Sequence, residues 1–133
     1  MIFSYDKELI LHVLAYPHTH TAQNVASDSQ APLALLKGLS YNRTLHEPLA
    51  SNISVDEEIL TRIAEDEYLN WGAKLLVAEH IKATPQIYEI LSTFEHVELD
   101  RIIITKKDLT DRTLRYLKRS RDLEVRKKAR TIS

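Results

Sequence analysis

Residues 49–64 read LASNISVDEEILTRIA and contain the boundary between two helices. An apolar pair ends one helical pattern, and a polar turn follows it. Leu60 and Ile63 then stand three residues apart, which places both side chains on one helix face. Ser54 and Glu57 have the S-x-x-E spacing of a capping box, in which each side chain satisfies a free backbone N–H of the other residue. The stretch therefore predicts a helix, a tight turn and a second helix.

Imperfect copies of this arrangement recur along the chain. A leucine-like residue recurs at intervals of 25, 24, 28 and 26 residues, at Leu14, Leu39, Ile63, Leu91 and Leu117. Three residues before each of them stands an apolar residue of the same helix face, namely Leu11, Leu36, Leu60, Tyr88 and Leu114. A second mark follows each pair, at Val25-Ala26, Leu49-Ala50, Val77-Ala78, Ile104-Thr105 and Lys128-Ala129. Tyr88 is therefore expected to be a core residue.

A repeat of this length predicts an all-α fold, specifically an α-solenoid of about five short helical repeats of 24–28 residues. In a solenoid each unit buries its apolar face only by stacking on its neighbours. A plain helical bundle with evenly spaced apolar stripes is the alternative interpretation. Within a single domain of residues 1–133, we place the units at residues 6–30, 31–54, 55–82, 83–108 and 109–133.

Other residues predict where helices begin and how closely they pack. Thr84-Pro85 puts a capping residue before a proline at the first helical position, and Asp108 or Thr110 can cap the first helix of the fifth unit. Gly38 and Gly72 fall inside helical patterns, where glycine costs about 1 kcal/mol relative to alanine. Close packing of one helix on the next would explain these glycines, and local flexibility is the alternative.

The whole pattern, L-x-x-L/I-A followed by V/L-A-x-N/D and a polar turn, resembles the variant leucine-rich repeat and the broader HEAT-like α-solenoids. The best matches are Leu60-x-x-Ile63-Ala64, Leu49-Ala50-Ser51-Asn52 and Val25-Ala26-Ser27-Asp28. The resemblance implies units that each pair a short 3₁₀ or helical segment with an α-helix and that coil into a right-handed superhelix. One type of member carries an amino-terminal cysteine cluster for an iron–sulfur centre. That feature is not carried over, because this chain has no cysteine.

The composition excludes several kinds of site. Without cysteine the chain has no disulfide, thiolate metal site or cysteine nucleophile. His12, His18 and His20 form the densest histidine cluster, but no further ligand is spaced for zinc. We interpret them as polar loop residues and expect no metal and no cofactor. His80 stands where Asn52 stands in the preceding unit, which predicts a backbone-capping role.

No apolar run approaches the roughly 20 residues that a helix needs to span a bilayer. We therefore expect no membrane partner and a soluble, cytoplasmic protein. Charge is unevenly distributed: residues 1–100 hold 6 Lys and Arg against 15 Asp and Glu, whereas residues 101–133 hold 12 against 4. The two segments carry net charges of −9 and +8. This asymmetry indicates an anionic partner for the basic end, and it would also allow homo-oligomers to form through the acidic and basic ends.

The basic residues of the last segment fall on helix faces. The candidate partner-binding residues are Arg112, Arg115, Tyr116, Arg119, Arg126, Lys127 and Arg130. The first four lie on one face of a predicted helix, opposite Leu114 and Leu117. Three interpretations remain open: a solvated cap of the solenoid, a surface for an acidic protein partner, or a stripe that neutralises nucleic-acid phosphates while Tyr116 stacks on a base.

A weaker acidic candidate consists of Glu65, Asp66 and Glu67, which lie at a helix end where the helix dipole disfavours negative charge. A solvated turn is the alternative. The chain has no G-x-S-x-G, H-E-x-x-H or glycine-rich phosphate motif, and we expect no enzymatic activity. We therefore expect a non-enzymatic binding module that presents a curved surface to a protein partner. The alternative is a nucleic-acid-binding solenoid that uses the basic residues of 101–133.

Overall fold

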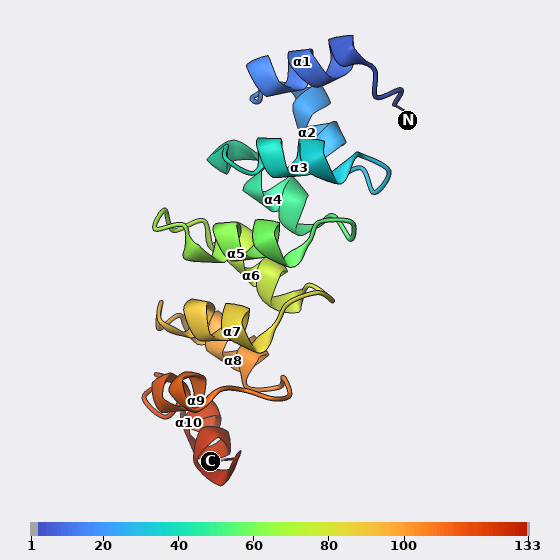
Figure 1. Ribbon diagram of the computed structural model, residues 1–133. Coiled ribbons are helices and arrows are strands. Elements are labelled where there is room, and N and C mark those ends of the chain that lie inside the picture. Colours follow the sequence, from blue (N-terminus) through green and yellow to red (C-terminus); the bar gives the residue numbers. More distant parts are fainter. Residues whose placement is uncertain (1–2, 133) are drawn as a thin grey trace.

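The computed structural model describes residues 3–132, which form ten α-helices, one short 3₁₀ helix and no β-strand (Figure 1). The α-helices are α1 (Lys7–Ala15), α2 (His20–Ala26), α3 (Leu33–Leu39), α4 (His46–Ala50), α5 (Glu57–Glu65), α6 (Trp71–Glu79), α7 (Pro85–Ser92), α8 (Val97–Ile103), α9 (Asp111–Leu117) and α10 (Leu123–Ile132). The 3₁₀ helix η1 (Arg43–Leu45) precedes α4. The predicted all-α fold is confirmed. No helix in the described part of the chain is long and apolar enough to cross a membrane.

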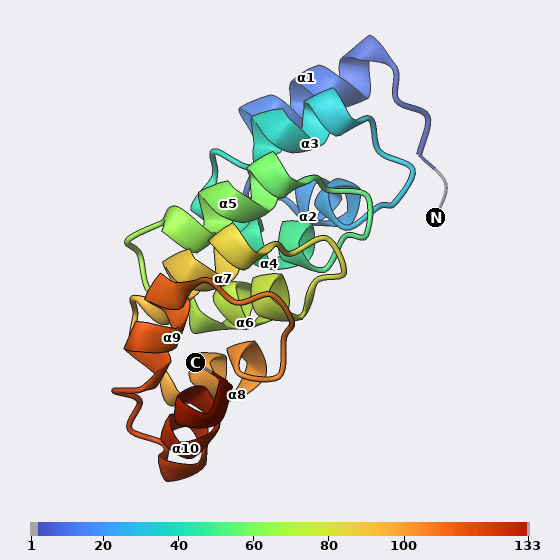
Figure 2. The same ribbon diagram turned by 60° about the horizontal axis from the view of Figure 1, so that its bottom comes forward.

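The helices form two layers, and alternate helices share a layer (Figures 1 and 2). In the odd-numbered layer α3 packs on α1, α7 on α5 and α9 on α7. In the even-numbered layer α4 packs on α2, α6 on α4 and α8 on α6. Successive helices also pair across the layers, as α1 does with α2, α5 with α6, α7 with α8 and α9 with α10. The chain thus advances by one helix pair at a time.

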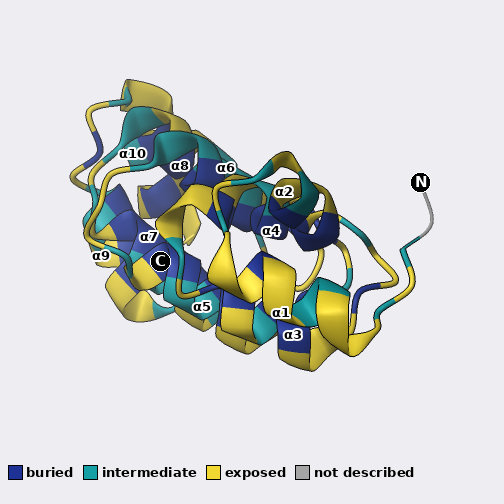
Figure 3. Cartoon of the chain, turned by 90° about the horizontal axis from the view of Figure 1, so that it is seen from above, coloured by how far each residue is buried: buried dark blue, intermediate teal, exposed yellow. Residues whose placement is uncertain are grey.

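The core lies between the two layers, and the outer faces of the helices are exposed (Figure 3). The apolar repeat marks of the last four units are at most 7 % exposed, namely Leu36, Leu39, Leu60, Ile63, Tyr88, Leu91, Leu114 and Leu117. Tyr88 is therefore a core residue, as predicted. The recurring marks in these units correspond to recurring core positions.

The first unit departs from the predicted register. Leu11 and Leu14 are 56 % and 45 % exposed, whereas Val13 is fully buried. Helix α1 begins after its N-cap residue Asp6, and this start turns Val13 inward instead of Leu14. Residues 9–14 are apolar at all positions but one. An apolar pair with i, i+3 spacing can therefore be drawn at Leu11 and Leu14 or at Ile10 and Val13. The sequence analysis chose the first pair, and this choice was wrong.

The second repeat mark is buried as predicted in the first three units, at Val25-Ala26, Leu49-Ala50 and Val77-Ala78. It is shifted by one residue in the fourth unit. There Ile103 is fully buried and Thr105 is exposed, because α8 ends at Ile103. In the fifth unit Ala129 is buried and Lys128 is exposed, so only the alanine of that mark is a core residue.

Thr84 and Thr110 cap α7 and α9, and each accepts a backbone N–H of the first turn, as predicted. The predicted capping box was wrong. The N-cap of α5 is Asp56, whose Oδ1 accepts a first-turn N–H at 3.0 Å. Ser54 Oγ donates instead to Ser29 O of the preceding unit at 2.6 Å. The local spacing failed here because the Ser54 hydroxyl has a partner in a neighbouring unit.

Side chains in two of the turns tie the second unit to the first and the third unit to the second. Asn52 Nδ2 donates to Ala26 O and to Asp28 O, at 2.9 Å in both cases. One unit later, His80 Nε2 donates to Asn52 O at 2.9 Å, while His80 Nδ1 accepts the N–H of Lys82 at 3.1 Å. The backbone-capping role predicted for His80 is confirmed.

The two glycines lie where neighbouring helices approach closely. A Cβ atom on Gly72 of α6 would collide with Glu47 Oε1 of α4. A Cβ atom on Gly38 of α3 would come within 3.2 Å of Leu14 Cδ2 of α1. Both contacts are with the ends of side chains that can rotate, so the close approach at these glycines involves neighbouring side chains and not a neighbouring helix backbone.

Candidate binding surface on α5 and α9

Helix α9 presents a basic surface with a hollow of about 140 Å³. The hollow is lined by Arg112, Arg115, Tyr116 and Arg119. The three arginines are exposed and Tyr116 is half-buried, while Leu114 and Leu117 on the inner side of the helix are buried. Among residues 3–132, none of the three guanidinium groups forms an ion pair. This surface can therefore accept an anion without first breaking an internal ion pair.

The basic residues predicted on the last helix lie outside this hollow. Lys127 and Arg130 are exposed on α10, which belongs to the other layer. Arg126 is half-buried, and its Nη1 donates to Ser120 O at 2.7 Å. Arg126 thus holds the turn that follows α9, and the hollow is built from α9 residues.

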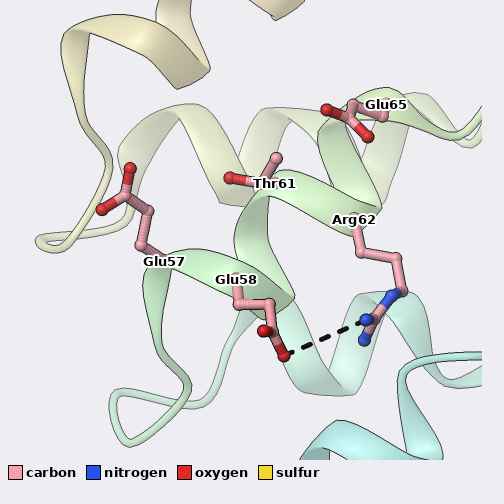
Figure 4. A pocket seen from close by; sticks show the side chains of 5 residues that line it. All are labelled: Glu57, Glu58, Thr61, Arg62 and Glu65. Carbon is pink, nitrogen blue, oxygen red and sulfur yellow. Dashed lines mark ion pairs between the residues drawn. The ribbon is translucent and has the colours of Figure 1, made fainter.

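Helix α5, in the same layer as α9, carries a second hollow of about 470 Å³ (Figure 4). Its lining consists of Glu57, Glu58, Thr61, Arg62 and Glu65. Arg62 Nη2 lies 3.9 Å from Glu58 Oε2, and the Arg62 guanidinium lies 4.0 Å from the centroid of the Tyr41 ring. Three of the five lining residues are glutamates, so this surface is acidic overall.

Of the predicted acidic residues, Glu65 lines the α5 hollow and Glu67 lies exposed in the turn that follows α5. Asp66 is engaged within the molecule. Arg43 Nε donates to both of its carboxylate oxygens, at 3.0 and 2.9 Å, and His46 Nδ1 lies 3.5 Å from Oδ2. The Asp66 side chain is only 11 % exposed, so Glu65 and Glu67 are the members of this group that face solvent.

A polar residue recurs in the even-numbered helices, three residues before the second repeat mark. These residues are His46, Lys74, Asp100 and Arg126, which precede Leu49, Val77, Ile103 and Ala129. The first three are buried and Arg126 is half-buried. The sequence reasoning missed them as a set. Leu49 and Val77 begin predicted marks, but Ile103 lies outside the predicted mark of its unit and Ala129 is the second residue of its mark, so the common spacing becomes visible only from the buried positions of the structure.

Lys74 binds the carboxyl-terminal end of α5. Its Nζ donates to Ile63 O and Ala64 O at 3.0 Å and to Asp66 O at 2.7 Å. These carbonyl groups lie at the end of the helix, where the helix dipole favours a cation. The side chain is 1 % exposed, and burial lowers the pKa of Lys74 to about 8.

His46 and Asp100 are also used inside the helix stack. Burial lowers the pKa of His46, so its ring is neutral at pH 7, and Nε2 donates to Ser40 O at 3.0 Å. Asp100 Oδ2 accepts a hydrogen bond from Ser120 Oγ at 2.8 Å, whereas Oδ1 is buried without a partner among the described residues. Burial raises the pKa of Asp100.

In the described range 3–132, no group of three or more histidine, aspartate or glutamate side chains is arranged to hold a metal ion. The residues that come together at the surface are those of the α5 and α9 hollows. No protein-family model, no curated protein and no solved structure matches the chain.

Proposed function

We propose that the chain is a right-handed α-solenoid of five helix pairs that acts as a non-enzymatic binding module. The contact pattern supports a solenoid, because the main contacts join helices two places apart, as in α4 with α6, α5 with α7 and α6 with α8, and helices that follow each other in the chain. The hydrogen bonds between turns support it as well, since those from Asn52, Ser54 and His80 join residues 24 to 28 positions apart. A plain bundle has no reason to repeat contacts at the sequence period.

The observation that carries the binding function is the group of three unpaired arginines and Tyr116 on α9. Three exposed guanidinium groups on one short helix repel one another, and this arrangement destabilises the isolated chain unless an anion binds there. Arginine pairs with carboxylates in a bidentate geometry, and tyrosine adds rigid contact area, so both residue types are enriched where proteins bind proteins. The partner that fits this surface is a protein with an acidic surface.

The second candidate is a nucleic acid, because Tyr116 among arginines could stack on a base while the arginines contact phosphates. A nucleic acid requires positive charge along its path. The α5 surface of the same layer carries glutamates, and it would repel a polyanion that extended along the layer from α9. The acidic α5 surface therefore favours a compact acidic protein over an extended polyanion.

The test measures binding of two fluorescent probes, a polyglutamate peptide and a single-stranded oligonucleotide, by anisotropy at low salt. We expect the peptide to bind and the combined variant R112E/R115E/R119E to weaken its binding at least about tenfold, which corresponds to about 1.4 kcal/mol. The matched control is K106E/K107E/K128E, which changes the net charge equally but lies outside the α9 hollow. An equal loss in both variants, or binding of the oligonucleotide alone, would contradict the proposal.

A further inference from the structure

The α5 and α9 hollows occupy the same positions of two different units. The residues Glu58, Thr61, Arg62 and Glu65 stand 54 positions before Arg112, Arg115, Tyr116 and Arg119. The N-cap residues Asp56 and Thr110 are separated by the same 54 positions, as are the buried residues Ile63 and Leu117. The equivalence is therefore structural: the four residues of the α9 hollow match four of the five residues of the α5 hollow in position on the helix, and Glu57 is the one without a counterpart.

Helix α7 lies between these two helices in the odd-numbered layer and packs on both of them. Its counterparts of Arg112, Tyr116 and Arg119 are uncharged, namely Gln86, Ile90 and Thr93. The fourth counterpart, Glu89, accepts a hydrogen bond from Thr110 Oγ1 at 2.7 Å, which draws it toward α9. Across α5, α7 and α9, the outer surface thus changes from several glutamates on α5, through the single charged residue Glu89 among these positions of α7, to the arginines of α9.

We propose that this surface binds a second copy of the chain, with the two stacks antiparallel about a two-fold axis that runs parallel to α7. This dimer rests on the proposed function, because it takes the odd-numbered layer as the binding surface. Rotation by 180° about such an axis places α5 of one copy against α9 of the other and leaves the helix directions unchanged. Equivalent positions of the two helices then face each other.

The resulting contacts are complementary at each level of the helix. Glu58, in the first turn of α5, faces Arg112 of the second copy, and Glu65, at the end of α5, faces Arg119 of the second copy. Arg62 faces Tyr116 of the second copy, while its guanidinium lies over the Tyr41 ring of its own chain and donates to Ser40 Oγ and to the Tyr41 hydroxyl. Because the interface is isologous, each contact forms twice. The α7 surfaces meet at the axis, and the charged residue of each, Glu89, accepts a hydrogen bond from Thr110 of its own chain.

The charges also favour this axis, parallel to α7, over a two-fold axis that runs along the stack. A two-fold axis along the stack would place α5 on α5 and α9 on α9, and so would oppose glutamates to glutamates and arginines to arginines. Opposite charge pairs favour the antiparallel form, and like charges across an interface disfavour the other. The pairs are exposed at the edges of a small interface, so the dimer should be weak and sensitive to salt.

The experiment measures the molar mass of the full chain in solution by sedimentation equilibrium. We expect twice the monomer mass at about 20 mM salt and the monomer mass at about 500 mM, where exposed charges are screened within a few ångströms. The variants E58R/E65R and R112E/R119E should each remain monomeric at low salt, because each opposes like charges. Their equimolar mixture should recover the dimer, because one variant then presents two basic surfaces and the other two acidic ones.

The matched control is E98R/E79R, which reverses a first-turn glutamate of α8 and the last residue of α6 in the even-numbered layer. This variant should dimerise like the wild type. Far-ultraviolet circular dichroism confirms that each variant is folded. A monomeric wild type at low salt, a mixture that stays monomeric, or assemblies larger than a dimer would each overturn the proposal.

The outcome is separable from that of the proposed function. The variant E58R/E65R leaves the arginines of α9 unchanged, and as a monomer it leaves them uncovered. If it binds the polyglutamate peptide while the wild type never dimerises, the acidic-protein function stands and the dimer falls. If the wild type dimerises and E58R/E65R does not bind the peptide, the dimer stands and the acidic-protein function falls.

Discussion

Lys74 shows how a single charged side chain can be part of a helical core. Its amine reaches three carbonyl oxygens at the end of α5, at 2.7 to 3.0 Å, and lies 4.4 Å from the centroid of the Phe94 ring. The four methylene groups of the side chain pack among apolar neighbours, and the amine satisfies acceptors that would otherwise be buried without donors. Burial nevertheless disfavours the charged form, and this is why the pKa of Lys74 falls to about 8.

This pKa makes the stability depend on pH. The folded chain releases the Lys74 proton near pH 8, whereas the unfolded chain holds it until the ordinary value of 10.5. Since the unfolded state binds more protons between these values, the free energy of unfolding should rise with pH, by about 2 kcal/mol between pH 8 and pH 10. Urea denaturation of the wild type and of Lys74→Met measures the rise. We expect the variant to lack it, and the same slope in both proteins would contradict this role.

Besides connecting the helix pairs, the turns supply side chains that form hydrogen bonds between successive pairs. Asn52 uses its whole amide: Nδ2 donates to two carbonyl groups of the preceding unit, and Oδ1 accepts the N–H of Ser54 at 2.9 Å. His80 then donates to the carbonyl of Asn52. These bonds fix the distance between successive pairs, so the even-numbered helices stack at a regular spacing.

Asn52→Ala should therefore destabilise the stack and not merely the turn. It leaves the buried Ala26 O and the Ser54 N–H without the Asn52 side chain, while Asp28 O keeps the Ala31 N–H. We expect a loss of about 2–4 kcal/mol in the free energy of unfolding. Asn24→Ala, an exposed change on α2, serves as the control and should stay within about 0.5 kcal/mol of the wild type. Thermal and chemical denaturation measure both. A loss at Asn52 no larger than that at Asn24 would show that the turns do not couple the units.

Among residues 3–132, the main contacts between helices lie within a helix pair or between neighbouring pairs. Helix α9 packs on α7 and α10 on α9, so the last pair caps the stack without reaching its far end. The unequal charges follow the same direction, with the acidic residues concentrated before residue 101 and the basic ones after it. A linear arrangement of this kind separates opposite charges in space, whereas a bundle would bring them together.

Removal of residues 109–133 should consequently leave α1 to α8 folded. Each remaining pair keeps its neighbour on at least one side, and in a quasi-linear stack stability is a sum of unit and interface terms. We expect a lower melting temperature, a cooperative transition, and a loss of helix signal no larger than α9 and α10 account for. Circular dichroism and amide hydrogen exchange measure this. Collapse of the whole helix content would indicate a single interdependent bundle instead.

The helical class and the caps at Thr84 and Thr110 could be predicted from the sequence, because they depend on side chains within four residues of one another. The same reasoning located the α9 basic face, since i, i+3 and i+7 positions share one side of any helix. Other features depend on which residues of different helices meet in space. They include the burial of Lys74, the pairing of Asp66 with Arg43 and the inward turn of Val13. The units differ in length, so the alignment of Glu58 with Arg112 becomes evident only when the caps and core positions that orient both helices are known.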